Sequence, residues 1–175
     1  GLVAEARVVD NSGREVPHGT PGEVEVRGPN VFFEYWGNRQ ATAEALVEGW
    51  YRSGDIATRD ADGHFYVHDR KQNLIISGGE NIYPAEVERV LLAHPAIAEA
   101  AVIGCADLRW QEVPVGCIVL RAGLTASAEE IEAFCLRELA RYKVPRRLLF
   151  LDGLPRNVMG KVQHFVLKER FGAAR

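Results

Sequence analysis

The sequence predicts an α+β protein in two parts, a β-rich stretch over residues 1–69 and a mixed stretch over residues 70–175 with a short sheet flanked by helices. The first part alternates apolar and polar residues between turn signals, whereas the second interleaves short apolar runs with segments of helical periodicity. The composition agrees with this class, because 47% hydrophobic and 26% charged residues are typical of a globular protein.

Strands and one helix are expected in the first part. Residues 2–9 form a plausible strand, followed by a turn at Asn11-Ser12-Gly13. Residues 22–28 alternate, with Val24 and Val26 on one face and the charged residues on the other. A short helix over residues 38–47 should stop at Gly49, and the segments 56–58 and 64–68 flank a turn and predict a β-hairpin.

Helices and strands alternate in the second part. The boundary lies near residues 69–73, where a short apolar strand over residues 74–76 begins the new pattern. Pro84 opens a helix, and Ser127 with Glu130 forms a capping box that opens another, which must end before Pro145. The remaining elements are strands over residues 100–104, 115–120 and 148–151, a loop over 155–160 and a short final helix.

Charge, length and metal-ligand spacing exclude several classes of protein. The 175 residues carry a net charge of −3, which argues against nucleic acid as a partner. No apolar run reaches the roughly 18–20 residues of a membrane span. The three cysteines suit small buried residues in a reducing cytosol, and we expect a cytoplasmic protein. The cysteines and histidines lack zinc-site spacings, so no protein-bound metal is expected. The chain begins without Met, and we expect it to be an internal piece of a longer protein.

Three stretches carry residues suited to chemistry. Asp55, after Ser53-Gly54, offers two acceptor oxygens to a ribose diol, although such an Asp is also a common turn residue. Residues 69–84 read as a hinge followed by a glycine-lined passage, or as a solvated linker and a tight turn. Lys161 lies on a glycine-flanked loop, where a mobile ammonium can pair with carboxylate and phosphate oxygens, or can simply be a surface lysine.

In this order and at these separations the stretches resemble the AMP-forming adenylating family, which includes acyl-CoA synthetases, firefly luciferase and the adenylation domains of nonribosomal peptide synthetases. The resemblance covers essentially the whole chain and includes residues 22–30, 49–55, 69–86, 99–104, 142–145 and the Lys161 loop. It implies that residues 1–69 are the C-terminal tail of the large N-terminal AMP-binding domain and residues 70–175 the small C-terminal lid domain. The sequence of residues 77–84 resembles acyl-CoA synthetases more than it resembles the adenylation domains of peptide synthetases.

The resemblance also implies a mechanism. A carboxylic acid and ATP, accompanied by Mg²⁺, would give an acyl-adenylate and pyrophosphate, and the thiol of coenzyme A (CoA) would then displace AMP. Asp55 would bind the ribose hydroxyls, Arg70 the ribose or its phosphate neighbourhood, and Lys161 the acid carboxylate and the α-phosphate. Between the two steps the lid would swing about Gln72, a position where many relatives carry Asp or Lys.

Contacts with CoA are implied as well. Gly78 and Gly79 would line the passage for the pantetheine arm, since a glycine has no side chain to block it. Trp110 would stack on the adenine. Tyr142 and Lys143 are further candidates, although local packing of Trp110 and a solvated Lys143 explain these residues at least as well. Relatives often carry Gly where Gln111 stands.

Alternatives remain open on the sequence alone. The phosphate loop, the metal-ligating acid and the acyl pocket of the family lie upstream, so we expect the chain to be inactive alone. The acceptor is CoA, or instead a carrier-protein thiol, or the enzyme is luciferase-like. A non-catalytic binding module is the third reading. Fatty, aryl and dicarboxylic acids all remain possible substrates, and an oligomer is possible.

Overall fold

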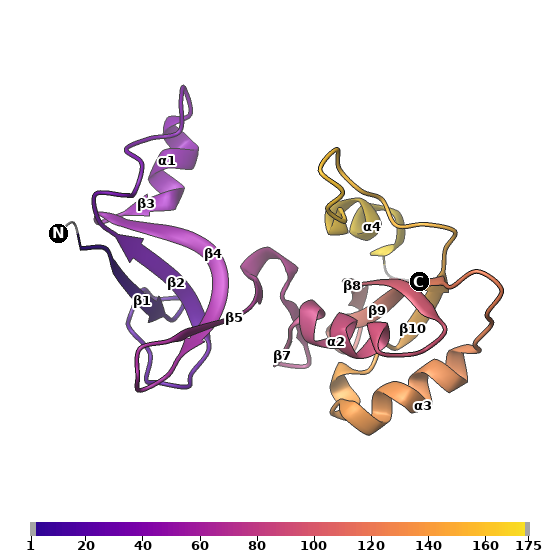
Figure 1. The fold of residues 1–175 in the computed structure, drawn as a ribbon. Helices are drawn as coiled ribbons and strands as arrows, with labels where there is room; N and C mark the ends of the chain where they lie inside the picture. Colours follow the sequence, from indigo (N-terminus) through magenta and orange to yellow (C-terminus); the bar gives the residue numbers. More distant parts are fainter. Residues whose placement is uncertain (1–2, 174–175) are drawn as a thin grey trace. The chain divides into compact units, whose positions relative to one another are not determined.

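Two five-stranded sheets, one in each half of the chain, organise the fold (Figure 1). The computed structural model describes residues 3–173. The chain divides between Gln72 and Asn73 into two compact units, called here the N-terminal and the C-terminal unit. No helix within residues 3–173 has the length and apolar character that crossing a membrane requires.

The N-terminal unit is an antiparallel sheet with one short helix. Its order is β1-β2-β4-β3, and β5 pairs with β4 beside the turn that connects them. The elements are β1 (Glu5–Val9), β2 (Gly22–Arg27), α1 (Arg39–Ala45), β3 (Leu46–Val47), β4 (Trp50–Arg59) and β5 (Phe65–Arg70). The predicted strands and the predicted hairpin are therefore present.

The helix α1 ends earlier than the sequence suggests. Asn38 caps its start by accepting a hydrogen bond from the main-chain N–H of Ala41 at 3.0 Å. The expected extension to residue 47 is wrong, because Leu46 and Val47 pair with β4 instead. Glu48 and Gly49, with φ of 51° and 80°, form the two-residue turn that this pairing requires.

The charged face of β2 is its buried face. Glu25 is 2% exposed and Glu23 is 9% exposed, whereas the valines between and beside them are only half-buried. Arg7 donates two hydrogen bonds to Glu25 at 2.7 and 3.0 Å, and the Arg52 Nε lies 3.4 Å from the same carboxylate. Pairing with guanidinium groups keeps this carboxylate charged away from water.

The C-terminal unit is built around β9 (Gln111–Leu120). This strand pairs antiparallel with β8 (Ile97–Asp107) and parallel with β10 (Arg147–Phe150), and its first residue meets Ser77 of β6. The other elements are a 3₁₀ turn at Lys71–Asn73 that leads into the unit, β6 (Ile75–Ser77), β7 (Glu80–Ile82), α2 (Pro84–Leu92), α3 (Ala128–Glu138), a 3₁₀ turn at Arg141–Lys143 and α4 (His164–Phe171). The capping box of α3 is confirmed, with both of its hydrogen bonds present. The strand expected over residues 74–76 is present as β6, whereas β7 and its pairing with β6 in a hairpin were not expected from the sequence.

Helices cover both faces of this second sheet (Figure 1). On one face, Val102 and Ile118 pack with apolar residues of α2 and α3 such as Leu91 and Ile131. On the other face, Ile103 and Cys117 belong to a cluster that includes Leu167 of α4. Successive residues of β8 therefore belong to opposite clusters, as the alternation of side chains along a strand requires.

Candidate functional site

A bulge in β4 presents Asp55. The pairing of β2 with β4 runs from Glu25↔Arg52 to Glu23↔Ile56, so residues 53–55 lie opposite Val24 alone. Gly54 takes a φ of +72°, which favours glycine. The Ser53 hydroxyl donates to the Val24 carbonyl at 2.7 Å and accepts from the Asp55 N–H at 3.1 Å. Residues 53–55 therefore form a bulge held by hydrogen bonds, not a free turn.

Asp55 and Arg70, the two residues expected to bind a nucleotide, lie side by side. They are opposite each other on β4 and β5, and the Arg70 Nε lies 3.0 Å from Asp55 Oδ1. Arg70 also donates from Nη1 to the Ser53 carbonyl at 3.0 Å. Both side chains stay partly exposed, at 32% for Asp55 and 49% for Arg70. The pair offers acceptors for hydroxyl groups and donors for phosphate oxygens.

Glu23 is a polar residue in contact with the bulge that presents Asp55, and the sequence reading did not single it out. It accepts from the Gly54 N–H at 3.2 Å and from Lys71 Nζ at 2.9 Å. Lys71 begins the 3₁₀ turn that also contains Gln72, the expected hinge. No signal in the sequence pointed to Glu23, because a strand glutamate that alternates with valines is expected to face water.

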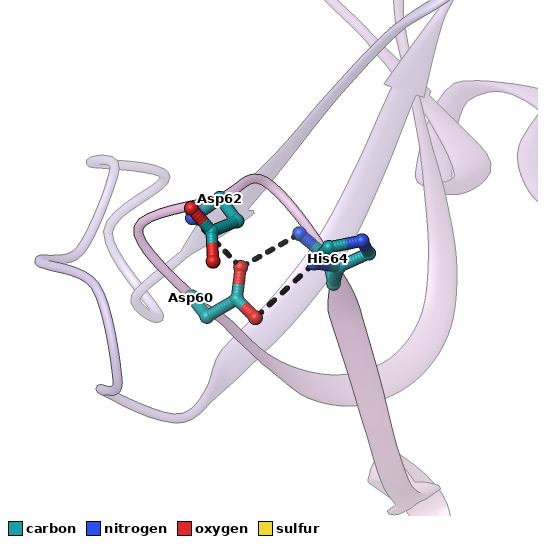
Figure 2. A group of neighbouring side chains, drawn as sticks. All are labelled: Asp60, Asp62 and His64. Atoms are coloured by element: carbon teal, nitrogen blue, oxygen red, sulfur yellow. Dashed lines mark hydrogen bonds and ion pairs between the residues drawn. The ribbon is translucent and has the colours of Figure 1, made fainter.

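Asp60, Asp62 and His64 gather at the turn between β4 and β5 (Figure 2). Among the described residues they are the one group of three acidic or imidazole side chains close enough to share an ion. Asp60 Oδ1 accepts from the N–H groups of Asp62 and His64, and Oδ2 accepts from the Tyr66 hydroxyl at 2.9 Å. The His64 N–H and the Tyr66 hydroxyl hold the pKa of Asp60 below its usual range. Asp60 therefore stabilises the turn between β4 and β5 by accepting these hydrogen bonds.

Gly78 and Trp110 lie in contact in the C-terminal unit. Gly78 and Gly79 form the β6–β7 turn with φ of +59° and +87°. A Cβ on Gly78 would come within 2.5 Å of the Trp110 ring, while a Cβ on Gly79 would meet nothing within 4 Å. The Gly78 N–H donates to the Trp110 carbonyl at 2.9 Å. The missing side chain at Gly78 thus makes room for an indole ring of the same chain.

The Trp110 turn between β8 and β9 is fixed by Asp107. Its Oδ1 accepts from the N–H groups of Arg109 at 2.8 Å and Trp110 at 2.9 Å. These main-chain hydrogen bonds, that from Trp110 first, lower the pKa of Asp107. Gln111 takes a φ of +68°, a conformation that suits glycine better. The guanidinium carbons of Arg109 and Arg146 lie 4.8 and 5.9 Å from the Trp110 ring centroid.

Tyr142 and Lys143 lie in the second 3₁₀ turn, Arg141–Lys143. Lys143 Nζ donates to both carboxylate oxygens of Glu86 at 2.7 Å, and it lies 5.8 Å from the Tyr142 ring centroid. Its side chain is 20% exposed. This ion pair ties the turn to α2, so Lys143 is not the solvated lysine that the sequence left open as its alternative.

Lys161 lies at the exposed end of a loop whose main chain is well held. Asn157 Oδ1 accepts from the N–H groups of Met159 at 3.0 Å and Lys161 at 2.9 Å, and the Asn157 N–H donates to the Lys161 carbonyl at 2.9 Å. Arg156 bonds the Gly160 carbonyl at 2.6 Å and also the Glu99 carboxylate. Within residues 3–173 the Lys161 ammonium has no ion pair or hydrogen bond. The loop therefore presents an unengaged ammonium from a fixed backbone.

Four of the candidate residues, Trp110, Tyr142, Lys143 and Lys161, lie in a segment that matches a known family. Residues 86–161 match the model of the AMP-binding enzyme C-terminal domain. This segment is such a domain. The AMP-binding enzyme C-terminal domain thus spans α2 to the Lys161 loop, and the resemblance to adenylating enzymes noted from the sequence is confirmed.

Known proteins similar to the chain are CoA ligases. Feruloyl-CoA synthase of Amycolatopsis sp is 47% identical over 96% of this chain and 34% of its own length. Indoleacetate–CoA ligase of Aromatoleum aromaticum is 47% identical over 90% of this chain and 31% of its own length. The chain thus spans about a third of the length of the curated relatives it matches.

A solved structure extends the similarity to the fold. The o-succinylbenzoate CoA synthetase of Bacillus subtilis, in complex with its acyl-adenylate intermediate, is 43% identical, with a TM-score of 0.88. The match covers 94% of this chain and 34% of that one. The mixed α and β architecture expected from the sequence is confirmed by this match.

Proposed function

We propose that the chain is the C-terminal part of an ATP-dependent acid–CoA ligase, which joins a carboxylic acid to CoA through an acyl-adenylate. The observation that carries the proposal is Lys161, an exposed ammonium without a protein partner among the described residues, held on a braced loop. The CoA ligases named above, at 47% identity, support the same reaction class.

In the first step a carboxylate oxygen of the acid attacks the α-phosphorus of ATP. The new oxygen–phosphorus bond forms while the bond from the α-phosphorus to the bridging oxygen breaks, and pyrophosphate leaves. Negative charge gathers on the α-phosphate oxygens, and the Lys161 ammonium offsets it. Asp55 accepts hydrogen bonds from the ribose hydroxyls, and Arg70, held at 3.0 Å from Asp55, orients that carboxylate and contacts the ribose or phosphate.

Magnesium enters with ATP in this proposal. Mg²⁺ prefers phosphate oxygens and water over a site made wholly of protein. The Asp60 turn does not offer it a ready site, because both oxygens of Asp60 already accept hydrogen bonds from the hairpin. None of the residues assigned above is needed to hold the ion.

In the second step the thiol of CoA attacks the acyl carbonyl, a thioester bond forms and AMP leaves. Gly78 and Gly79 border the pantetheine passage, and Gln72, where the chain divides into its two units, is the pivot that exchanges the groups used in each step. Trp110 and Tyr142 contact the CoA nucleotide. Lys143 can join them only by leaving Glu86, so its part is secondary.

Pyrophosphate exchange into ATP tests the first step. We expect exchange with the full-length protein and none with the 175-residue chain, because the phosphate loop and acyl pocket lie outside it. Lys161→Ala in the full-length protein should reduce exchange by about 10²- to 10³-fold, in line with losing one charge-stabilising group. Lys168→Ala is the matched control, since Lys168 is engaged with Glu112 at 2.8 Å. Unchanged exchange in Lys161→Ala would favour the non-catalytic module.

Release of AMP identifies the acceptor. CoA should stimulate release from the full-length protein, whereas a stimulating carrier protein would point to the peptide-synthetase alternative and light emission to a luciferase-like enzyme. The acid is screened with aryl, fatty and dicarboxylic acids. We rank aryl acids first, because the similar ligases are named for ferulate and indoleacetate.

We place the enzyme in the cytoplasm, which supplies ATP and CoA and keeps thiols such as its three free cysteines reduced.

A further inference from the structure

Glu23 is a buried carboxylate to which the proposed mechanism gives no task. Its side chain, on β2, is 11% exposed. A carboxylate with so little access to water stays ionised at low cost only when its oxygens have partners. Both oxygens do, because Oε1 accepts from the Gly54 N–H at 3.2 Å and Oε2 from Lys71 Nζ at 2.9 Å.

Each partner of Glu23 precedes a residue with a proposed role. Gly54 comes directly before Asp55 in the bulge of β4. Lys71 comes directly before Gln72, the last residue of the N-terminal unit. One side chain therefore connects the turn that presents Asp55 to the chain segment that ends at the pivot.

Arg70 closes the same connection from the strand side. It reaches Asp55 Oδ1 with Nε and the Ser53 carbonyl with Nη1, both at 3.0 Å. The bulge is thus bonded on one side to Glu23 and on the other to the strand that leads to Lys71. Such a doubly bonded segment can pass a change in the mobility of one end to the other.

We propose that Glu23 is a positioning residue that couples the Asp55 turn to the N-terminal side of the Gln72 pivot. The importance of this coupling for catalysis rests on the proposed function, whereas the contacts of Glu23 lie wholly within the N-terminal unit. Lys71, held by Glu23, supplies beside the pivot the charge that the uncharged Gln72 lacks. Rotation is then confined to the bonds from Gln72 onward, and a nucleotide that stiffens the Asp55 turn also stiffens the pivot.

Hydrogen exchange of the full-length protein, followed by mass spectrometry, tests the coupling without catalysis. Lys71→Met removes the ion pair, and Glu23→Gln keeps an amide oxygen for Gly54 but loses the negative charge that pairs with the ammonium. In both variants the peptide over residues 69–75 should exchange about three- to fivefold faster. Glu15→Gln is the matched control, because it removes another ion pair of this unit, with Arg59 at 3.2 Å. Unchanged exchange at residues 69–75 in both variants overturns the proposal.

A second comparison, of Glu23→Ala with Glu23→Gln, tests the separate roles of the two carboxylate oxygens of Glu23. Glu23→Ala should also speed exchange over residues 51–58, whereas Glu23→Gln should leave that peptide near the wild-type rate. In pyrophosphate exchange, Glu23→Ala should raise the KM for ATP by about tenfold, with most of this rescued by Glu23→Gln. An equal loss in both variants contradicts the assignment of Oε1 to Gly54. A wild-type protein without pyrophosphate exchange would refute the proposed function, while the exchange rates at residues 69–75 still decide the role of Glu23.

Discussion

The Cβ that Gly78 lacks would lie 2.5 Å from the ring of Trp110. The indole and the glycine turn come from separate segments of the C-terminal unit, and the Gly78 N–H donates to the Trp110 carbonyl. The turn expected to border the pantetheine passage and the ring expected to stack on adenine therefore form one structure. Whatever moves one of them moves the other.

Gly78→Ala should destabilise the C-terminal unit by about 2–4 kcal/mol, because the methyl group forces the indole away and the residue keeps a positive φ. Gly79→Ala is the control, with a positive φ but open space, and should cost about 1 kcal/mol. Urea unfolding, with hydrogen exchange of peptides from β8 and β9 as the readout, measures both. Equal costs would mean that backbone strain alone accounts for Gly78.

Gln111→Gly should leave the stability unchanged or raise it by up to about 1 kcal/mol. Gln111 has a φ of +68°, and relief of the left-handed strain exceeds or balances the greater freedom of glycine in the unfolded chain. Thermal unfolding of wild type and variant gives the difference. A loss above about 1 kcal/mol would show that the Gln111 side chain stabilises the turn by contacts of its own.

Glu25→Ala should cost the N-terminal unit about 1–3 kcal/mol, because it removes the shared partner of Arg7 and Arg52, whose side chains are 27% and 39% exposed and remain solvated. Glu5→Ala removes an exposed pair with Arg27 and should cost no more than about 1 kcal/mol. Urea unfolding, with hydrogen exchange of peptides from β1 and β2 as the readout, compares the two. Similar small costs in both variants would show that the buried cluster contributes little.

Alkaline pH should weaken the C-terminal unit. Burial raises the pKa of the Cys117 and Cys135 thiols to about 11, from an ordinary 9.0. Between pH 9 and 11 the unfolded chain releases protons that the folded chain keeps, so the free energy of unfolding falls as the pH rises. Urea unfolding across this range measures the slope.

The same two thiols provide a control and a second readout. A double Cys117→Ala, Cys135→Ala variant should lose less stability between pH 9 and 11 than the wild type does. In the folded wild type at about pH 8, the fraction of thiolate at either site should be roughly a hundredfold lower than in the unfolded chain, because the higher pKa of the buried thiol keeps it protonated. Rapid labelling of Cys117 or Cys135 in the folded protein, located by peptide mass spectrometry, would contradict the burial of that cysteine.

Local signals in the sequence were enough for many elements. The capping box at Ser127, the proline that opens α2 and the hairpin around residues 60–63 each depend on groups a few residues apart, and all three are confirmed. The resemblance to the adenylating family, expected from the order of three short stretches, is confirmed by the match of residues 86–161 to the AMP-binding enzyme C-terminal domain. Boundaries were less accurate, since β3 takes Leu46 and Val47 from the expected helix by pairing with β4.

Contacts between distant segments determined the features that the sequence did not predict, namely which face of β2 is buried and how residues 53–55 are held. The alternation of β2 correctly separated valines from glutamates, but Arg7, Arg52 and Lys71 cover the acidic face and bury it. A reading of periodicity assigns the apolar face to the interior, because it counts hydrophobicity and not the charges that other strands will bring. Likewise, residues 53–55 show their chemistry in the sequence, whereas the cross-strand hydrogen bonds that hold the bulge, with Val24, Glu23 and Arg70, form only in the folded sheet. Residue identity and spacing thus carry the chemistry and the local turns, and the three-dimensional pairing of strands sets burial, orientation and partners.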